Sequence, residues 1–111
     1  MKQSHSMEDE FEARFYQYAN FNNPKKDGKI TLNNIDFWLK EARILNISGG
    51  ITQIDTSEIF SNTAKNGNRL TFEGFKKFVQ TLASNKKMEV HELIDQLVRT
   101  RNPNIGSQIH L

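Results

Sequence analysis

Apolar side chains recur along the chain at the spacings of three and four residues that place them on one face of an α-helix. This pattern predicts an all-α fold of about five helices. They are expected over about residues 7–18, from 32 through 45, from 52 through 60, from 72 through 82, and over about residues 88–99.

Polar and glycine residues mark the ends of several of these segments. Thr31 is placed to cap the second helix, and the fourth helix starts after Thr71. Thr52 and Asp55 form a variant of the capping box at the start of the third. The Ser48-Gly49-Gly50 run is a strong helix breaker, so we expect the second helix to stop before it.

The aromatic residues fall on these predicted faces. Phe72, Phe75 and Phe78 form a stripe at helical spacing, and Trp38 lies on the stripe of the second helix. A stripe of this kind could line a ligand pocket, but burial in the core explains the spacing without a ligand. We therefore assign these side chains to the hydrophobic core.

The two halves of the chain resemble each other. Ile30-Thr31 precedes one predicted helix, and Leu70-Thr71 precedes another forty positions later. Each half reads as a helix, a loop that contains glycine, a short extended pair and a second helix. This is the plan of an EF-hand pair, in which the extended residues of both loops can form a short two-stranded ribbon. The sequence thus predicts two EF-hand-like helix–loop–helix halves.

The first loop lacks the ligands that calcium requires. An EF-hand loop carries oxygen ligands at positions 1, 3 and 5, glycine at position 6 and a bidentate glutamate at position 12. With Gly28 at position 6, position 3 is Lys25, position 5 is Asp27 and position 12 is Asn34. A calcium ion would meet one carboxylate and a repelling ammonium group.

The second loop is poorer still. With Leu70 in the extended apolar position, position 3 is Lys65 and position 12 is Gly74. A shift by one residue recovers Glu73 at position 12 but places Arg69 in the apolar position. We expect neither loop to bind calcium, and we expect Gly28 and Gly67 to supply positive φ angles in structural loops.

Length and composition indicate one globular domain. The chain has 111 residues, of which 36% are hydrophobic and none is cysteine. We expect a short disordered N-terminus over residues 1–8, a helical core over residues 9–100 and a tail over residues 101–111. No apolar run suits a signal peptide or a membrane span, so the cytoplasm is the expected location.

The net charge is only +2, but the cations cluster in the loops and along the fourth helix. Such a surface would attract an acidic protein partner, although charge runs are often only solvated helix faces. The candidate partner-binding residues are Lys25, Lys26, Lys29, Lys65, Arg69, Lys76, Lys77, Lys86 and Lys87.

No motif for other chemistry stands out. His5, His91 and His110 are dispersed and lack the spacing of a zinc site. The chain has no phosphate-binding loop and no catalytic arrangement of nucleophile and base. Its aromatic residues sit at core spacing rather than among the cations as stacking platforms, which argues against nucleic-acid binding. We expect no cofactor, no metal, no membrane association and no enzymatic activity.

In the order and spacing of its motifs, the sequence resembles the tubulin polymerization-promoting protein family over about residues 10–100. Four stretches carry the resemblance: Phe15-Tyr16-Gln17-Tyr18-Ala19; Gly28-Lys29-Ile30-Thr31 with Phe37-Trp38-Leu39-Lys40-Glu41-Ala42; Ile51-Thr52 and Asp55 with Ile59-Phe60-Ser61; and Leu70-Thr71-Phe72-Glu73-Gly74-Phe75 with Leu82-Ala83.

The resemblance implies a protein of the microtubule cytoskeleton that binds tubulin and promotes polymerization or stabilisation of microtubules. Tubulin's acidic surface would suit the basic residues. Bundling, zinc binding and weak self-association stay open, because the chain has no cysteine and only short segments flank its core. An axonemal or flagellar location also stays open. The alternative is a calcium-independent EF-hand-like adaptor that binds another acidic protein.

Overall fold

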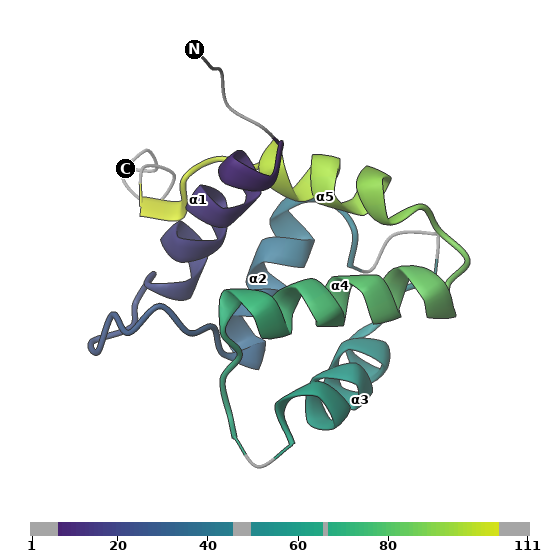
Figure 1. The fold of residues 1–111 in the computed structure, drawn as a ribbon, viewed down its shortest axis with the longest axis horizontal. Helices are drawn as coiled ribbons and strands as arrows, with labels where there is room; N and C mark the ends of the chain where they lie inside the picture. The colour runs from purple at the N-terminus through teal and green to yellow at the C-terminus, as the bar shows by residue number, and fades with distance from the viewer. Residues whose placement is uncertain (1–6, 46–49, 66, 105–111) are drawn as a thin grey trace.

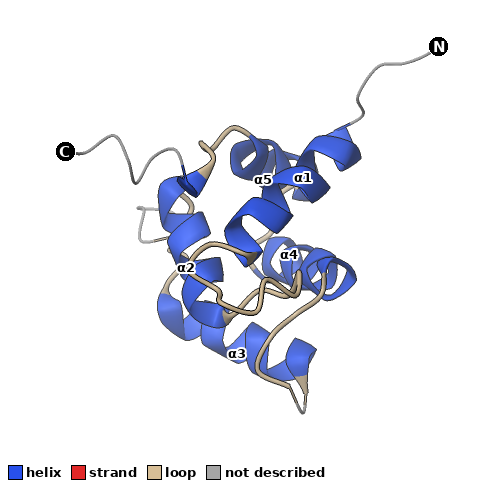
Figure 2. Cartoon of the chain, turned by 90° about the vertical axis from the view of Figure 1, so that its left-hand side faces the viewer, coloured by secondary structure: helices blue, strands red, loops and turns tan. Residues whose placement is uncertain are grey.

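The chain folds into five helices in the computed structural model, which describes residues 7–45, 50–65 and 67–104. The helices are α1 (Met7–Ala19), α2 (Leu32–Glu41), α3 (Gln53–Ala64), α4 (Phe72–Asn85) and α5 (Val90–Val98). Figures 1 and 2 show that helices and loops make up the described part of the chain. The predicted all-α fold is confirmed.

Helix α4 lies at the centre of the arrangement (Figure 1). It packs against α1, α3 and α5, while α2 packs against α1 and α3. The fifth helix rests on α1 and α4, so it covers the first helix of one half and the last helix of the other. Among the described residues, no helix is both long enough and apolar enough to cross a membrane.

Threonine side chains cap three helices as the sequence predicts. The hydroxyls of Thr31 and Thr71 accept hydrogen bonds from the backbone N–H three residues on, at 3.2 and 3.1 Å. Thr52 and Asp55 form a reciprocal capping box at the start of α3. These bonds satisfy N–H groups that have no partner inside the helix.

The end of α2 differs from the prediction. The helix stops at Glu41 rather than reaching Leu45, because Arg43 adopts a positive φ of 63°. The N–H groups of Arg43 and Ile44 then donate to the carbonyls of Lys40 and Leu39, which is the Schellman pattern of a helix end. Leu45 is still buried. The apolar stripe therefore predicted correctly that Leu45 is buried, although the helix ends before it.

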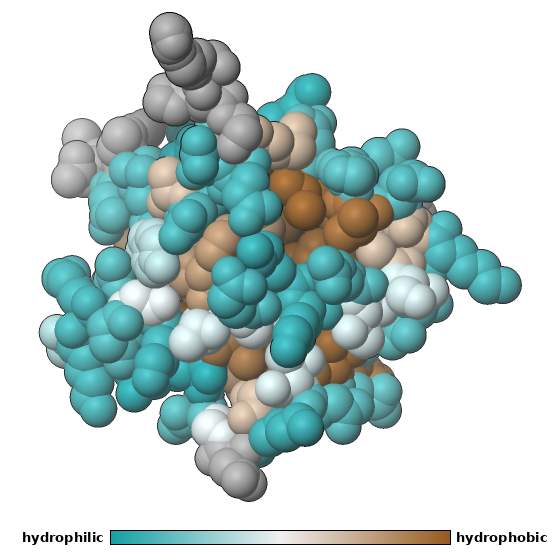
Figure 3. All heavy atoms as spheres, viewed as in Figure 1, coloured by the Kyte–Doolittle hydropathy of each residue, from teal (hydrophilic) through white to brown (hydrophobic). Residues whose placement is uncertain are grey.

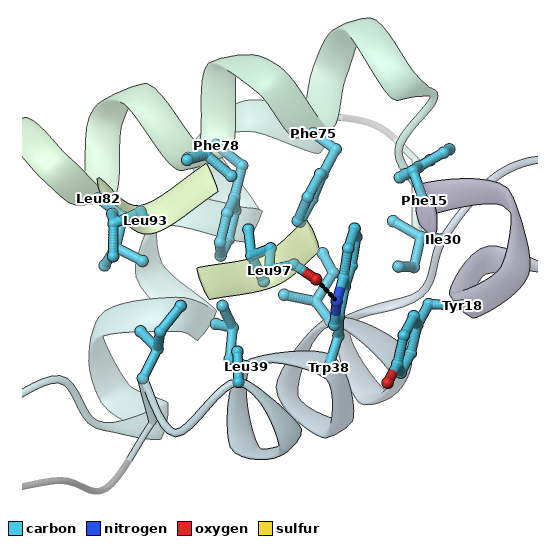
Figure 4. Packing of buried hydrophobic residues seen from close by; sticks show 14 of the residues in the cluster. Phe15, Tyr18, Ile30, Trp38, Leu39, Phe75, Phe78, Leu82, Leu93 and Leu97 are labelled. Atoms are coloured by element: carbon cyan, nitrogen blue, oxygen red, sulfur yellow. Dashed lines mark hydrogen bonds between the residues drawn. The ribbon is translucent and has the colours of Figure 1, made fainter. Parts of the chain in front are cut away.

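A chain of stacked aromatic rings forms the centre of the core (Figure 4). Trp38 stacks on Tyr18 on one side and on Phe75 on the other, with ring centroids 4.9 and 5.1 Å apart. Phe75 stacks in turn on Phe78 at 5.8 Å. Trp38, Phe75 and Phe78 are fully buried and Phe72 nearly so, which confirms that these side chains form a core rather than a ligand pocket.

Polar side chains cover most of the outer face seen in Figure 3, and apolar surface remains visible between α5 and α4. Leu93 and Leu97 of α5 are buried. The Trp38 indole N–H donates to the Leu97 carbonyl at 3.1 Å and to the Thr100 hydroxyl oxygen at 2.9 Å. Trp38 therefore joins the first half of the chain to the end of α5 (Figure 4).

The two interhelical loops meet at one pair of residues. Ile30 and Leu70 form an antiparallel bridge, in which each N–H donates to the other's carbonyl at 2.8 Å. Both side chains are buried. The two-stranded ribbon that the repeat suggested is not formed among the described residues. The contact is this single bridge, since the Thr31 and Thr71 caps start α2 and α4 at the next residue.

We expect Trp38→Phe to lower the free energy of unfolding by about 2 kcal/mol. The change removes buried ring volume and the two hydrogen bonds to the end of α5. Urea unfolding monitored by circular dichroism measures the effect. Phe37→Leu is a control at a half-buried neighbour, for which we expect a smaller loss. A Trp38→Phe protein as stable as the wild type would contradict the role given to Trp38.

Candidate partner-binding surface

The first loop, residues 20–31, is closed by the side chain at calcium position 12. The Asn34 amide NH₂ donates to the carbonyls of Tyr18 and Phe21, both at 3.0 Å. These carbonyls belong to the end of α1 and the residues that follow it. Where a calcium loop has a carboxylate that accepts a cation, this loop has an amide that donates to the backbone.

Further hydrogen bonds shape the tip of the same loop. The Gly28 N–H donates to the Asn20 side-chain oxygen at 3.2 Å, and Gly28 has a positive φ of 76°. A Cβ at this position would lie 3.2 Å from the Tyr16 ring. Both the backbone angle and the close ring favour glycine, which confirms the role predicted for Gly28.

Asp27, the one carboxylate of this loop, binds groups of the protein itself. Its carboxylate accepts the Lys29 N–H at 3.2 Å and lies 2.7 Å from the Arg69 guanidinium of the second loop. Partial desolvation raises the pKa of Asp27, but these hydrogen bonds and the Arg69 charge outweigh it and hold the pKa below its ordinary value. Asp27 and Arg69 thus form a second link between the loops, beside the Ile30–Leu70 bridge.

In the second loop, residues 65–71, the positive φ angle is not at the glycine where it was predicted. The positive φ falls on Lys65, the residue that ends α3, with a value of 56°. Gly67 has no positive φ, so the role predicted for it is wrong. Its N–H instead donates to the Ala64 carbonyl at 3.0 Å in a tight turn. Within the described ranges, no group of three or more His, Asp or Glu side chains could hold a metal ion.

Three of the nine candidate cations form ion pairs inside the molecule. Arg69 binds Asp27 as described, and Lys86 lies 3.1 Å from the Asp55 carboxylate. Lys76 binds Glu8 at 3.0 Å and Glu73 at 3.3 Å, and its ammonium group sits 5.0 Å from the centre of the Phe72 ring. The two carboxylates raise the pKa of Lys76. These three side chains support the fold.

The other six candidates are exposed and form no ion pair among the described residues: Lys25, Lys26, Lys29, Lys65, Lys77 and Lys87. These six residues lie on separate elements of the fold. Four lie in or at the edge of the two loops, and the other two lie along α4 and just beyond its C-terminal end. His91 is exposed too, and Asp95, one turn along α5, pairs with Arg99 rather than with it.

A second basic surface was not predicted from the sequence. Arg43 follows α2, whereas Arg99 and Arg101 follow α5, yet all three line one groove at the ends of α1 and α2. We name this the arginine groove. Two half-buried aromatic rings, Phe21 and Phe37, also line it. Their convergence depends on the packing of α5, so no local sequence pattern could have shown it.

One comparison with known proteins assigns the family. The model of the family described as p25-alpha matches residues 12–110, which is nearly the whole chain. The chain belongs to the p25-alpha family. This is the tubulin polymerization-promoting protein family, so the predicted resemblance is confirmed. No curated protein matches the sequence.

Membership of the p25-alpha family associates the chain with tubulin and the microtubule cytoskeleton. The family match covers both helix–loop–helix halves and the arginine groove alike. The family match therefore does not identify the surface that contacts a partner, and the chemistry of the side chains has to indicate it.

We expect Asn34→Asp to destabilise this p25-alpha domain by about 2 kcal/mol at neutral pH. The substitution keeps the shape of the side chain but places a carboxylate oxygen against the Tyr18 and Phe21 carbonyls in place of a donor. Thermal unfolding followed by circular dichroism measures the loss.

Asn33→Asp is the matched control, because Asn33 is exposed and no hydrogen bond of its side chain is seen among the described residues. We expect this control to unfold near the wild-type temperature. If Asn34→Asp does so as well, the amide is not what closes the loop.

Proposed function

We propose that this protein binds tubulin and microtubules and promotes their polymerization or stabilisation. The family match carries the proposal. In this proposal the chain acts in the cytoplasm on the microtubule cytoskeleton, as a binding protein without catalytic activity. An axonemal or flagellar site of action is equally compatible with the fold.

The exposed cations support an electrostatic contact with an acidic partner. Lys25, Lys26 and Lys29 project from a loop that hydrogen bonds already hold in shape. A rigid basic loop loses little conformational entropy on binding, and its charge speeds association with an acidic surface. Bundling of filaments is a further element of the proposal. It requires either two contact sites on the protein or self-association.

The second candidate function is a calcium-independent, EF-hand-like adaptor for another acidic protein. The observation that favours it is the loop closure itself, because Asn34 and Asp27 already bind groups of the protein. Both functions use the same exposed loop lysines. The identity of the partner separates them.

Co-sedimentation with stabilised microtubules over a salt series tests the proposal. We expect the protein to pellet with microtubules at low ionic strength and to be released as salt screens the charges. Protein that stays in the supernatant at low salt would exclude microtubule binding and favour the adaptor.

The contact surface is tested by two variants with the same change in net charge. Lys25→Gln with Lys29→Gln removes two charges from the first loop, and we expect a loss of affinity of about tenfold. Lys40→Glu changes the charge by the same amount on the exposed face of α2, outside the candidate residues. We expect the Lys40 variant to bind like the wild type, and equal effects in both would indicate only a response to net charge.

A further inference from the structure

The arginine groove is an open depression of about 510 Å³ between the ends of α1 and α2 and the segment after α5. It is within the size range of sites that enclose a small ligand or a few side chains of a peptide. Its walls come from three parts of the chain that are distant in sequence. Stable packing of α5 is what keeps them together.

One wall of the groove is apolar and rigid. The Phe21 and Phe37 rings stack with centroids 5.4 Å apart, and Phe37 also packs against Tyr18 at 5.6 Å. Tyr18 is itself buried, and its hydroxyl donates to the Arg101 carbonyl at 2.9 Å. The half-buried rings therefore offer a fixed apolar surface to a side chain of a partner.

Three guanidinium groups line the groove. Arg43 and Arg101 are exposed, and neither forms an ion pair with any residue that the structure describes. Arg99 binds Asp95 at 2.9 Å, but its side chain is 76% exposed. Among the described residues that line the groove, Glu41 is the one acid. These lining residues together carry a net positive charge of two.

The backbone beneath these arginines is held in place. Arg43 lies in the left-handed conformation of the helix end, where two hydrogen bonds fix it. Arg101 is held through its carbonyl by Tyr18, and the nearby Pro103 is buried. Guanidinium groups on fixed backbone can pair bidentately with carboxylates at a low entropic cost.

We propose that the arginine groove binds an acidic peptide segment of the protein partner, with carboxylates on Arg43 and Arg101 and one apolar or aromatic side chain against Phe21 and Phe37. The proposal rests on the proposed function, since it adds a second surface, besides the loop lysines, that binds the acidic partner. The positive charge of the groove favours an acidic segment. The apolar wall favours a peptide with an apolar side chain over a simple anion.

Fluorescence anisotropy with two labelled peptides tests the proposal. One is a run of glutamates with a single central phenylalanine, and the other is the same run with serine in its place. We expect the phenylalanine peptide to bind more tightly. Arg43→Gln with Arg101→Gln should weaken its binding by about tenfold or more, because two charge-assisted contacts are lost. Lys40→Glu, with the same charge change, should leave it within about twofold.

Phe37→Leu separates a peptide site from a simple anion site. We expect it to reduce the preference for the phenylalanine peptide while leaving the serine peptide unchanged. Circular dichroism confirms that each variant is folded. Equal binding of both peptides by the wild type, or no effect of the arginine double variant, would overturn the proposal.

Co-sedimentation of the same variants separates this proposal from the proposed function. A wild type that does not pellet with microtubules removes the proposed function. A wild type that pellets, together with an arginine double variant that pellets equally, keeps that function and overturns the role of the groove. We expect the double variant to pellet less than both the wild type and Lys40→Glu.

Discussion

The reciprocal hydrogen bonds between Ile30 and Leu70 are the constraint on which the rest of the fold depends. They join the two helix–loop–helix halves at buried residues, and the capping threonines follow at once. Helices α2 and α4 therefore leave from one point, and their directions bring Trp38 against Phe75. The stacked rings then form the surface on which α5 packs. If the two loops separated, α2 and α4 would no longer start from the same point.

In a calcium-binding EF-hand pair, the bound ions hold the loops in shape. In this protein, side chains of the protein itself have that role. The Asn34 amide donates to backbone carbonyls, and the Asp27 carboxylate binds the Arg69 guanidinium of the other loop. Such a loop needs no ion to keep its shape. The basic side chains on it are then presented at all times, which is consistent with a constitutive contact to an acidic partner rather than a calcium switch.

Local patterns in the sequence were enough to predict the helices, the threonine caps and the aromatic core, because each depends on residues within a few positions of one another. They failed where a residue other than glycine took a positive φ, as at Arg43 and Lys65. They also could not show that Lys76 pairs with Glu8, 68 positions away, or that Arg43 meets Arg101 in one groove. Those contacts depend on how the helices pack against one another, and no short sequence motif predicts that packing.

Hydrogen exchange at the Ile30 and Leu70 amides, measured with a calcium chelator and again with millimolar calcium, tests this account most directly. If protein groups alone join the loops, both amides are strongly protected in the chelator, and calcium changes neither their exchange nor the free energy of unfolding. Amides that exchange rapidly in the chelator and become protected only with calcium would contradict it.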